Sequence, residues 1–131
     1  MINFFSKYKF IFYLCNFFLI FLYLYPGSLL GCFLYDDCKL QPQITPDFIV
    51  STNHLYAFVL LSSIGYLTFN KFSQFISLTV YLITLSIILE ILHYVIPDRS
   101  FEISDLFGNF IGVIIITIIV YFFKKNENIK N

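Results

Sequence analysis

Two long stretches without a charged side chain decide the fold: FSQFISLTVYLITLSIIL at residues 72–89 and LFGNFIGVIIITIIVYFF at residues 106–123. Each has close to the ~20 predominantly apolar residues that a helix needs to cross the hydrocarbon core of a bilayer. Two more uncharged stretches precede them, at residues 10–35 and 48–70. The sequence therefore predicts an all-α, four-transmembrane-helix bundle in a single domain, residues 1–131. The expected helices lie near residues 8–25, 50–69, 74–96 and 105–123.

The composition supports a membrane protein. Of the 131 residues, 59% are apolar and 12% are charged, and the mean hydropathy is +0.82. A soluble globular chain has about 25% charged residues, so this chain has too few to cover a water-exposed surface. A soluble enzyme and a disordered tail are therefore excluded. The net charge is zero, which gives no basic excess for nucleic acid, and no nucleic-acid partner is expected. The continuously apolar stretches also differ from the alternating strands of a transmembrane barrel.

The basic residues predict the orientation, because Lys and Arg are enriched in short cytoplasmic loops. Six of the eight lie near the two chain ends and in the turn between the second and third expected helices. With an even number of spans these three places share one side of the membrane. Only Lys39, in the loop 26–49, and Arg99, in the loop 97–104, lie on the other side. We therefore expect both termini in the cytoplasm and these two loops outside.

The first apolar stretch and the outer loop each allow two interpretations. Lys7 and Lys9 resemble the basic region of a cleaved signal peptide, although no small-residue cleavage site follows Tyr25. In the outer loop, Cys32 and Cys38 are either joined by a disulfide, as an oxidising compartment allows, or are two free thiols. They have too few neighbouring ligands for a metal site. The rest of this loop is expected to be an irregular connection.

Six polar side chains gather toward the outer ends of the second, third and fourth expected helices. Two of them are three residues apart on one helix face, and two others are four residues apart on another. Such groups are costly in lipid, usually face the interior of a bundle, and mark a functional site. The predicted ligand-binding residues are His54, Glu90, His93, Arg99, Asp105 and Asn109.

Each of these residues also has a structural interpretation. Asp105 follows a serine, and the pair can cap the fourth helix and complement its dipole. Asn109 can join helices by hydrogen bonds, and His54 can lie at the interface with its ring directed to water. Glu90 needs a partner at that depth or it becomes protonated, and Arg99 or His54 can provide one. A G-x-x-x-G pair on the fourth helix, Gly108 and Gly112, is a close-packing face for this chain or for a homo-oligomer.

The same cluster suits more than one ligand. Arg99, a protonated histidine and the N-terminus of the fourth helix together attract a phosphate. His54, Glu90 and His93 are a weaker candidate zinc site, because the E-x-x-H pattern of bundle metal sites occurs once instead of twice. No cofactor is expected. No serine or cysteine nucleophile stands beside a base. The candidate catalytic residues are therefore the ionisable groups Glu90, His54 and Asp105. A proton or solute pathway is disfavoured, because the polar residues crowd one end.

The spacing of these residues resembles a motif of the VanZ-like family of small integral membrane proteins. The family pattern is E-x-x-Q, P-x-R, D-x-x-x-N-x-x-G, preceded by a histidine that opens the span before it. The resemblance covers residues 48–120, and His54 is the equivalent of that histidine. This chain departs at three places: His93 replaces the glutamine, Val50 and Ser51 replace an Asp-Lys pair, and Ile116 replaces a second glycine. The matching segments are Glu90-x-x-His93, Pro97-x-Arg99 and Asp105-x-x-x-Asn109-x-x-Gly112.

The resemblance implies a cell-envelope protein of the bacterial inner (cytoplasmic) membrane, linked to resistance to the glycopeptide teicoplanin, and it supplies no reaction. Two hypotheses follow. In the first, the polar cluster binds an anionic membrane lipid or a lipid-linked envelope precursor without catalysis. In the alternative, the protein is a membrane-embedded enzyme that acts on a lipid-linked cell-wall intermediate, with Glu90 as general base and His54 or His93 as its acid partner.

Overall fold

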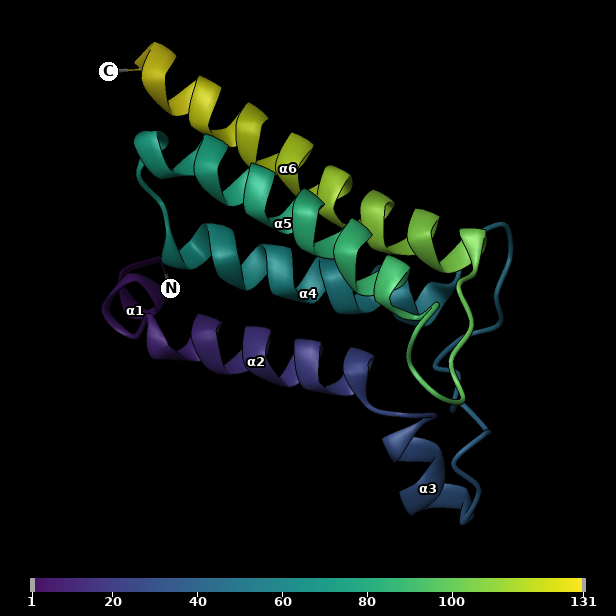
Figure 1. Ribbon diagram of the computed structural model, residues 1–131. Coiled ribbons are helices and arrows are strands. Elements are labelled where there is room, and N and C mark those ends of the chain that lie inside the picture. Colours follow the sequence, from purple (N-terminus) through teal and green to yellow (C-terminus); the bar gives the residue numbers. More distant parts are fainter. Residues whose placement is uncertain (1, 131) are drawn as a thin grey trace.

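The computed structural model describes residues 2–130, which fold into helices without a strand. Four helices run side by side as a bundle, and two short ones, α1 and α3, lie at its opposite ends (Figure 1). Within the bundle, α4 is central: it packs along α6 and also contacts α2 and α5. The helices are α1 (Ile2–Lys7), α2 (Phe10–Leu24), α3 (Leu29–Tyr35), α4 (Thr52–Thr68), α5 (Phe72–Leu92) and α6 (Ile103–Lys130).

Two helices, α5 and α6, are each long and apolar enough to cross a membrane, and α2 with α3 meets the same criterion as a pair bent by 78°. The structure thus contains two candidate spans, or three if the bent pair is one span. Helix α4 has 17 residues, about 26 Å at 1.5 Å per residue, slightly less than the ~30 Å of a hydrocarbon core.

The distribution of side chains fits a surface that faces lipid. Large apolar residues are widely exposed on the bundle helices, for example Phe17, Ile76 and Phe123 at 62–68%. Polar side chains, in contrast, are well represented in the interior, where Glu90 and Asn109 are completely buried. In water this distribution would expose apolar surface and desolvate polar groups. These features indicate association with a membrane.

The helix boundaries differ from the prediction in three places. The loop predicted for 26–49 contains α3, which begins because Ser28 Oγ accepts a hydrogen bond from the Gly31 amide at 3.0 Å. Helix α5 ends at Leu92 instead of near residue 96, because the His93 amide bonds to the Glu90 carbonyl three residues back, a tighter turn that ends the helix before Pro97. Helix α6 continues past the predicted residue 123, to Lys130.

Helices α4 and α6 approach each other closely at two glycines of α6. A Cβ atom at Gly108 would lie 2.6 Å from the Ser51 carbonyl oxygen, and one at Gly112 would lie 2.7 Å from that of Leu55. Any side chain at these positions would therefore meet the backbone of α4. The G-x-x-x-G face thus packs inside this chain, and α4 covers it against a second copy.

The corner between α2 and α3 turns the chain away from the bundle (Figure 1). Gly27 adopts a positive φ of 71°, which glycine reaches without steric cost. The amide of Ser28 then donates to the Cys38 carbonyl oxygen at 2.7 Å. Cys32 and Cys38 are joined by a disulfide, the first of the two alternatives considered. The corner is therefore fixed to the segment that follows α3.

Candidate functional site

The predicted polar residues meet at one end of the bundle, where α4 and α6 begin and α5 ends. Three of them, Glu90, His93 and Asn109, are at most 2% exposed, and His54 is 5% exposed. They are brought together because α4 and α6 run antiparallel to α5, so the start of two helices adjoins the end of the third (Figure 1). We call His54, Glu90, His93, Asp105 and Asn109 the polar cluster.

Glu90 and His93 are joined by a hydrogen bond. His93 Nε2 lies 3.1 Å from the Tyr23 carbonyl oxygen, which can only accept, so Nε2 carries a hydrogen. Its Nδ1 lies 3.2 Å from Glu90 Oε1. A hydrogen bond there requires a proton on Nδ1, giving an imidazolium–carboxylate pair, or on the carboxyl group of Glu90 with a neutral imidazole. The backbone amide of Glu102 also donates to Glu90 Oε1, at 3.2 Å.

His54 is fixed from both sides of its ring. Its Nδ1 lies 3.1 Å from Asn109 Oδ1, and Asn109 keeps this orientation because its Nδ2 donates to the Ser86 carbonyl oxygen at 3.3 Å. Nδ1 of His54 therefore carries a hydrogen. The opposite nitrogen, Nε2, lies 3.4 Å from Asp105 Oδ2. It is the atom of His54 that remains free to exchange a proton or bind a ligand.

Tyr23 belongs to the same network, although the sequence did not point to it. Its hydroxyl donates to Asn109 Oδ1 at 2.6 Å, and its ring stacks on that of His93 with centroids 5.8 Å apart. The chain has 10 tyrosines and 18 phenylalanines, so a single tyrosine in the first apolar stretch carries no sequence signal. Its place in the cluster depends on how α2 packs against the other helices.

Arg99 contacts the C-terminal end of α2 and not Glu90, for which it was one of the two partners considered. Among the described residues, the basic side chains within 4.0 Å of the Glu90 carboxylate are His93 and His54, and Arg99 is not its partner. Instead, Arg99 Nη2 donates to the Leu22 carbonyl oxygen at 2.8 Å and Nε to that of Tyr25 at 3.2 Å. These are the unpaired carbonyls at the C-terminal end of α2, where a cation also complements the helix dipole. Burial lowers the pKa of the Arg99 guanidinium from its usual range, while nearby acidic groups oppose this change.

Two clefts border the polar cluster. One has a volume of about 270 Å³ and a largely apolar lining that includes Leu22, Leu29 and Ala57, with His54 at its wall. The other, of about 170 Å³, has a largely polar lining that includes Asp105. We call them the apolar and the polar cleft. Both are lined by Ser28, Gln41 and Arg99.

The position of Glu90 changes the enzyme hypothesis. Glu90 is 0% exposed and lines neither cleft. Asp105, whose side chain is 18% exposed, borders the polar cleft, and so does His93. A substrate in the polar cleft would therefore meet Asp105 first, while Glu90 lies behind His54 and His93 and positions them.

The candidate zinc ligands also need correction. His93, which was grouped with His54 and Glu90, uses one nitrogen on the Tyr23 carbonyl and the other on Glu90. In the described part of the chain, the group of side chains with ligand atoms within 4.8 Å of one another is instead His54, Glu90 and Asp105.

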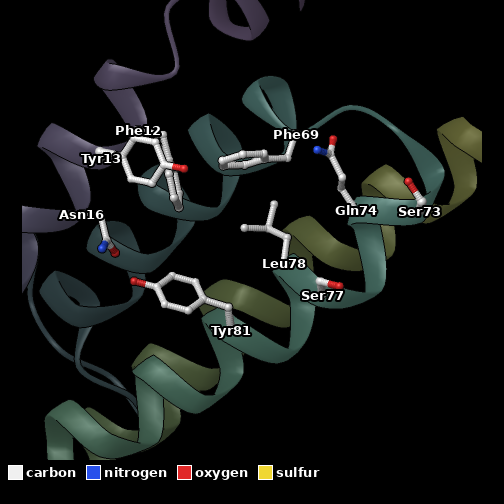
Figure 2. A pocket seen from close by; sticks show the side chains of 9 residues that line it. All are labelled: Phe12, Tyr13, Asn16, Phe69, Ser73, Gln74, Ser77, Leu78 and Tyr81. Carbon is white, nitrogen blue, oxygen red and sulfur yellow. The ribbon is translucent and has the colours of Figure 1, made fainter.

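A third cavity, of about 380 Å³, lies at the far end of the bundle between α2 and α5. Figure 2 shows Asn16 of α2 and Tyr81 of α5 close to each other on one side of it, with the rings of Phe12 and Tyr13 nearby on α2. Leu78, which also lines it, is 12 residues before Glu90, about 18 Å along a helix. This cavity is therefore separate from the polar cluster.

Comparisons of the chain with protein-family models, with curated proteins and with solved structures find no match.

Proposed function

We propose that this is a multi-pass protein of the bacterial cytoplasmic membrane with four spans and both termini in the cytoplasm. Helix α4 would be a span in addition to α5, α6 and the first apolar helix, which makes four. It packs along α6 and would cross the membrane together with it. Helix α1 and the far end of α6 lie at the same end of the bundle (Figure 1), as an even number of spans requires. Six of the eight basic residues belong to that end, in agreement with the positive-inside rule.

In this proposal the protein binds the headgroup of an anionic or lipid-linked envelope component in the outer leaflet. The observation that carries the proposal is the pair of clefts that share Arg99. An amphiphile has an apolar chain and a polar head, so its chain would occupy the apolar cleft and its head the polar cleft. Lys39 and Arg99 line the polar cleft and would offer positive charge to a phosphate.

The test is binding of a polyprenyl phosphate to the chain in lipid nanodiscs, with the uncharged polyprenol as a second probe. Lys39→Gln removes a cation of the polar cleft and should weaken binding of the phosphate about two- to fivefold, the range for an exposed ion pair, with no effect on the polyprenol. Lys71→Gln removes a lysine from the opposite end and serves as the matched control. If Lys39→Gln binds the phosphate as tightly as the unaltered chain, the headgroup proposal loses its support.

A second candidate function is catalysis on a lipid-linked cell-wall intermediate. The observation that favours it is His54, which is held between Asp105 and Asn109 with a defined tautomer, an arrangement that suits proton transfer. Asp105 would exchange the proton with the substrate, and Glu90 would position the histidines. Asp105→Asn should then abolish turnover of the intermediate while leaving its binding intact. Unchanged turnover in that variant would exclude this mechanism.

The resemblance to the VanZ-like family extends the proposal to teicoplanin. Expression of the chain in a susceptible Gram-positive host should raise the inhibitory concentration of teicoplanin, and Glu90→Gln should remove the effect. A normal level of the variant protein in the membrane fraction is the necessary control. An unchanged inhibitory concentration with the unaltered chain would contradict the link to glycopeptide resistance.

A further inference from the structure

We infer that His54, Glu90 and Asp105 bind one divalent transition-metal ion. Each residue comes from a different helix, α4, α5 and α6, and each offers a ligand atom within 4.8 Å of the other two. The inference does not rest on the proposed headgroup binding, because it concerns the buried side chains behind the clefts.

The tautomer of His54 leaves the required nitrogen free. Nδ1 donates its hydrogen to Asn109 Oδ1. In the neutral imidazole Nε2 then has the lone pair that a metal needs, and fixing a ligand in this way is common in metal sites. Nε2 lies 3.4 Å from Asp105 Oδ2. A tetrahedral ion with bonds of about 2.0–2.2 Å holds its ligand atoms about 3.3–3.6 Å apart. The pair therefore already has the separation of two ligands on one ion.

An unpaired oxygen of Glu90 supplies independent support. Glu90 is 0% exposed, and its Oε2 is buried without a hydrogen-bond partner in the part of the chain that the structure describes. Oε1, in contrast, accepts from the Glu102 amide and contacts His93. Burial of a carboxylate oxygen without a partner is costly. A cation bound by Glu90 together with His54 and Asp105, whose ligand atoms lie within 4.8 Å of one another, would remove that cost. The 3.7 Å separation between Oε2 and Nδ1 of His54, the nitrogen that faces Asn109, is too long for a hydrogen bond.

The ligand types select the class of ion. One imidazole nitrogen with two carboxylate oxygens suits Zn²⁺ or Mn²⁺, whereas Ca²⁺ and Mg²⁺ prefer sites made of oxygen atoms alone. His93 is a positioning residue, because its two nitrogens are engaged by Glu90 and the Tyr23 carbonyl. Asp105 borders the polar cleft, which provides a path for the ion. Binding displaces protons from the ligands, so affinity should increase with pH.

The test is titration of Zn²⁺ into the chelator-treated full chain in detergent, followed by calorimetry and by elemental analysis after gel filtration. We expect one equivalent of zinc per chain. Glu90→Gln, Asp105→Asn and His54→Gln each remove a ligand and should abolish stoichiometric binding. Two matched controls remove a carboxylate at the same end of the bundle, Glu102→Gln and Asp98→Asn, and should bind like the unaltered chain.

Two further measurements separate lost ligands from lost folding. Circular dichroism must show equal helix content in all variants, and Zn²⁺ should raise the melting temperature of the unaltered chain and of the two controls only. His93→Gln should keep one equivalent with affinity reduced about ten- to hundredfold, as expected when a group that supports a ligand is removed. Co²⁺ should give the visible absorption of a four-coordinate site. Undiminished binding in folded Glu90→Gln and Asp105→Asn, or no binding by the unaltered chain, would overturn the inference.

Discussion

At the scale of single residues, the cluster depends on where each hydrogen lies. Asn109 is decisive, because its oxygen accepts from Tyr23 at 2.6 Å and faces His54 at 3.1 Å, while its nitrogen donates to Ser86. One amide thus satisfies partners from three other helices and sets the tautomer of the histidine. A residue of the same size without these atoms would remove the acceptor of the Tyr23 hydroxyl and of His54 Nδ1.

We therefore predict that Asn109→Leu lowers the free energy of unfolding by about 1–3 kcal/mol, the cost of leaving buried polar groups without partners. Titration of the purified chain with SDS, followed by circular dichroism, measures the change. Asn16→Leu is the matched control, because Asn16 Oδ1 is buried without a partner among the described residues. The two variants should differ clearly; an equal loss would mean that the network does not stabilise the fold.

The sequence predicted that the polar residues gather, because polar side chains in a membrane avoid lipid and the helix ends are adjacent. It left the partner of Glu90 open between Arg99 and His54, and it did not predict the other contacts of the cluster. Glu90 pairs with histidines instead of Arg99, because the chain after α5 turns so that Arg99 reaches the end of α2. Tyr23 was missed for a related reason, since its role depends on which face of α2 points inward, and an almost uniformly apolar helix does not indicate that face.

At the scale of elements, apolar length predicts where helices lie, and local chemistry decides where they end. The cores of α2, α4, α5 and α6 coincide with the uncharged stretches. Helix α3 was not expected, since its seven residues follow a Pro-Gly turn and adjoin two aspartates. The sequence did indicate that α6 packs closely on another helix, because Gly108 and Gly112 form a G-x-x-x-G pair. The structure shows that this helix is α4.

Gly112→Ala should weaken the contact between α4 and α6. Alanine favours a helix over glycine by about 1 kcal/mol, but its Cβ would lie 2.7 Å from the Leu55 carbonyl oxygen, and overpacking costs about 1–3 kcal/mol. We therefore expect a net loss of unfolding free energy in an SDS titration. Gly65→Ala should be milder, because its Cβ would meet the side chains of Phe12 and Leu78, which can rotate. A stabilised Gly112→Ala would contradict the observed closeness of the two backbones.

At the scale of the whole molecule, the arrangement is that of a membrane protein, with polar groups inside and apolar side chains outside. Helices α5 and α6 are long and apolar enough to cross a membrane, and the placement of lysines gives the chain a predicted orientation. The proposed topology, with four spans and cytoplasmic ends, accommodates both the polar cluster at one end and the lysines at the other.

This topology predicts which cysteines a membrane-impermeant maleimide can reach in intact cells. In a chain with Cys15→Ser and Cys38→Ser, the remaining Cys32 should react from outside. A cysteine introduced at the other end by Asn126→Cys, in a chain without other cysteines, should react only after the cells are permeabilised. The opposite labelling pattern would mean that the protein has the inverse orientation in the membrane. Reaction of both cysteines from outside would require an odd number of spans.

The bend before α3 has a consequence for how deep the protein sits in its membrane. Helix α3 is bent by 78° from α2 and exposes the apolar side chains of Leu30, Phe33 and Leu34, so it can lie flat in the interfacial region with these side chains in lipid. One end of the bundle is then anchored at a constant height. A thicker or thinner bilayer would be accommodated at the opposite end, where long lysine side chains can adjust. The distance from the polar cluster to the adjacent headgroups would thus stay constant as the composition of the membrane varies.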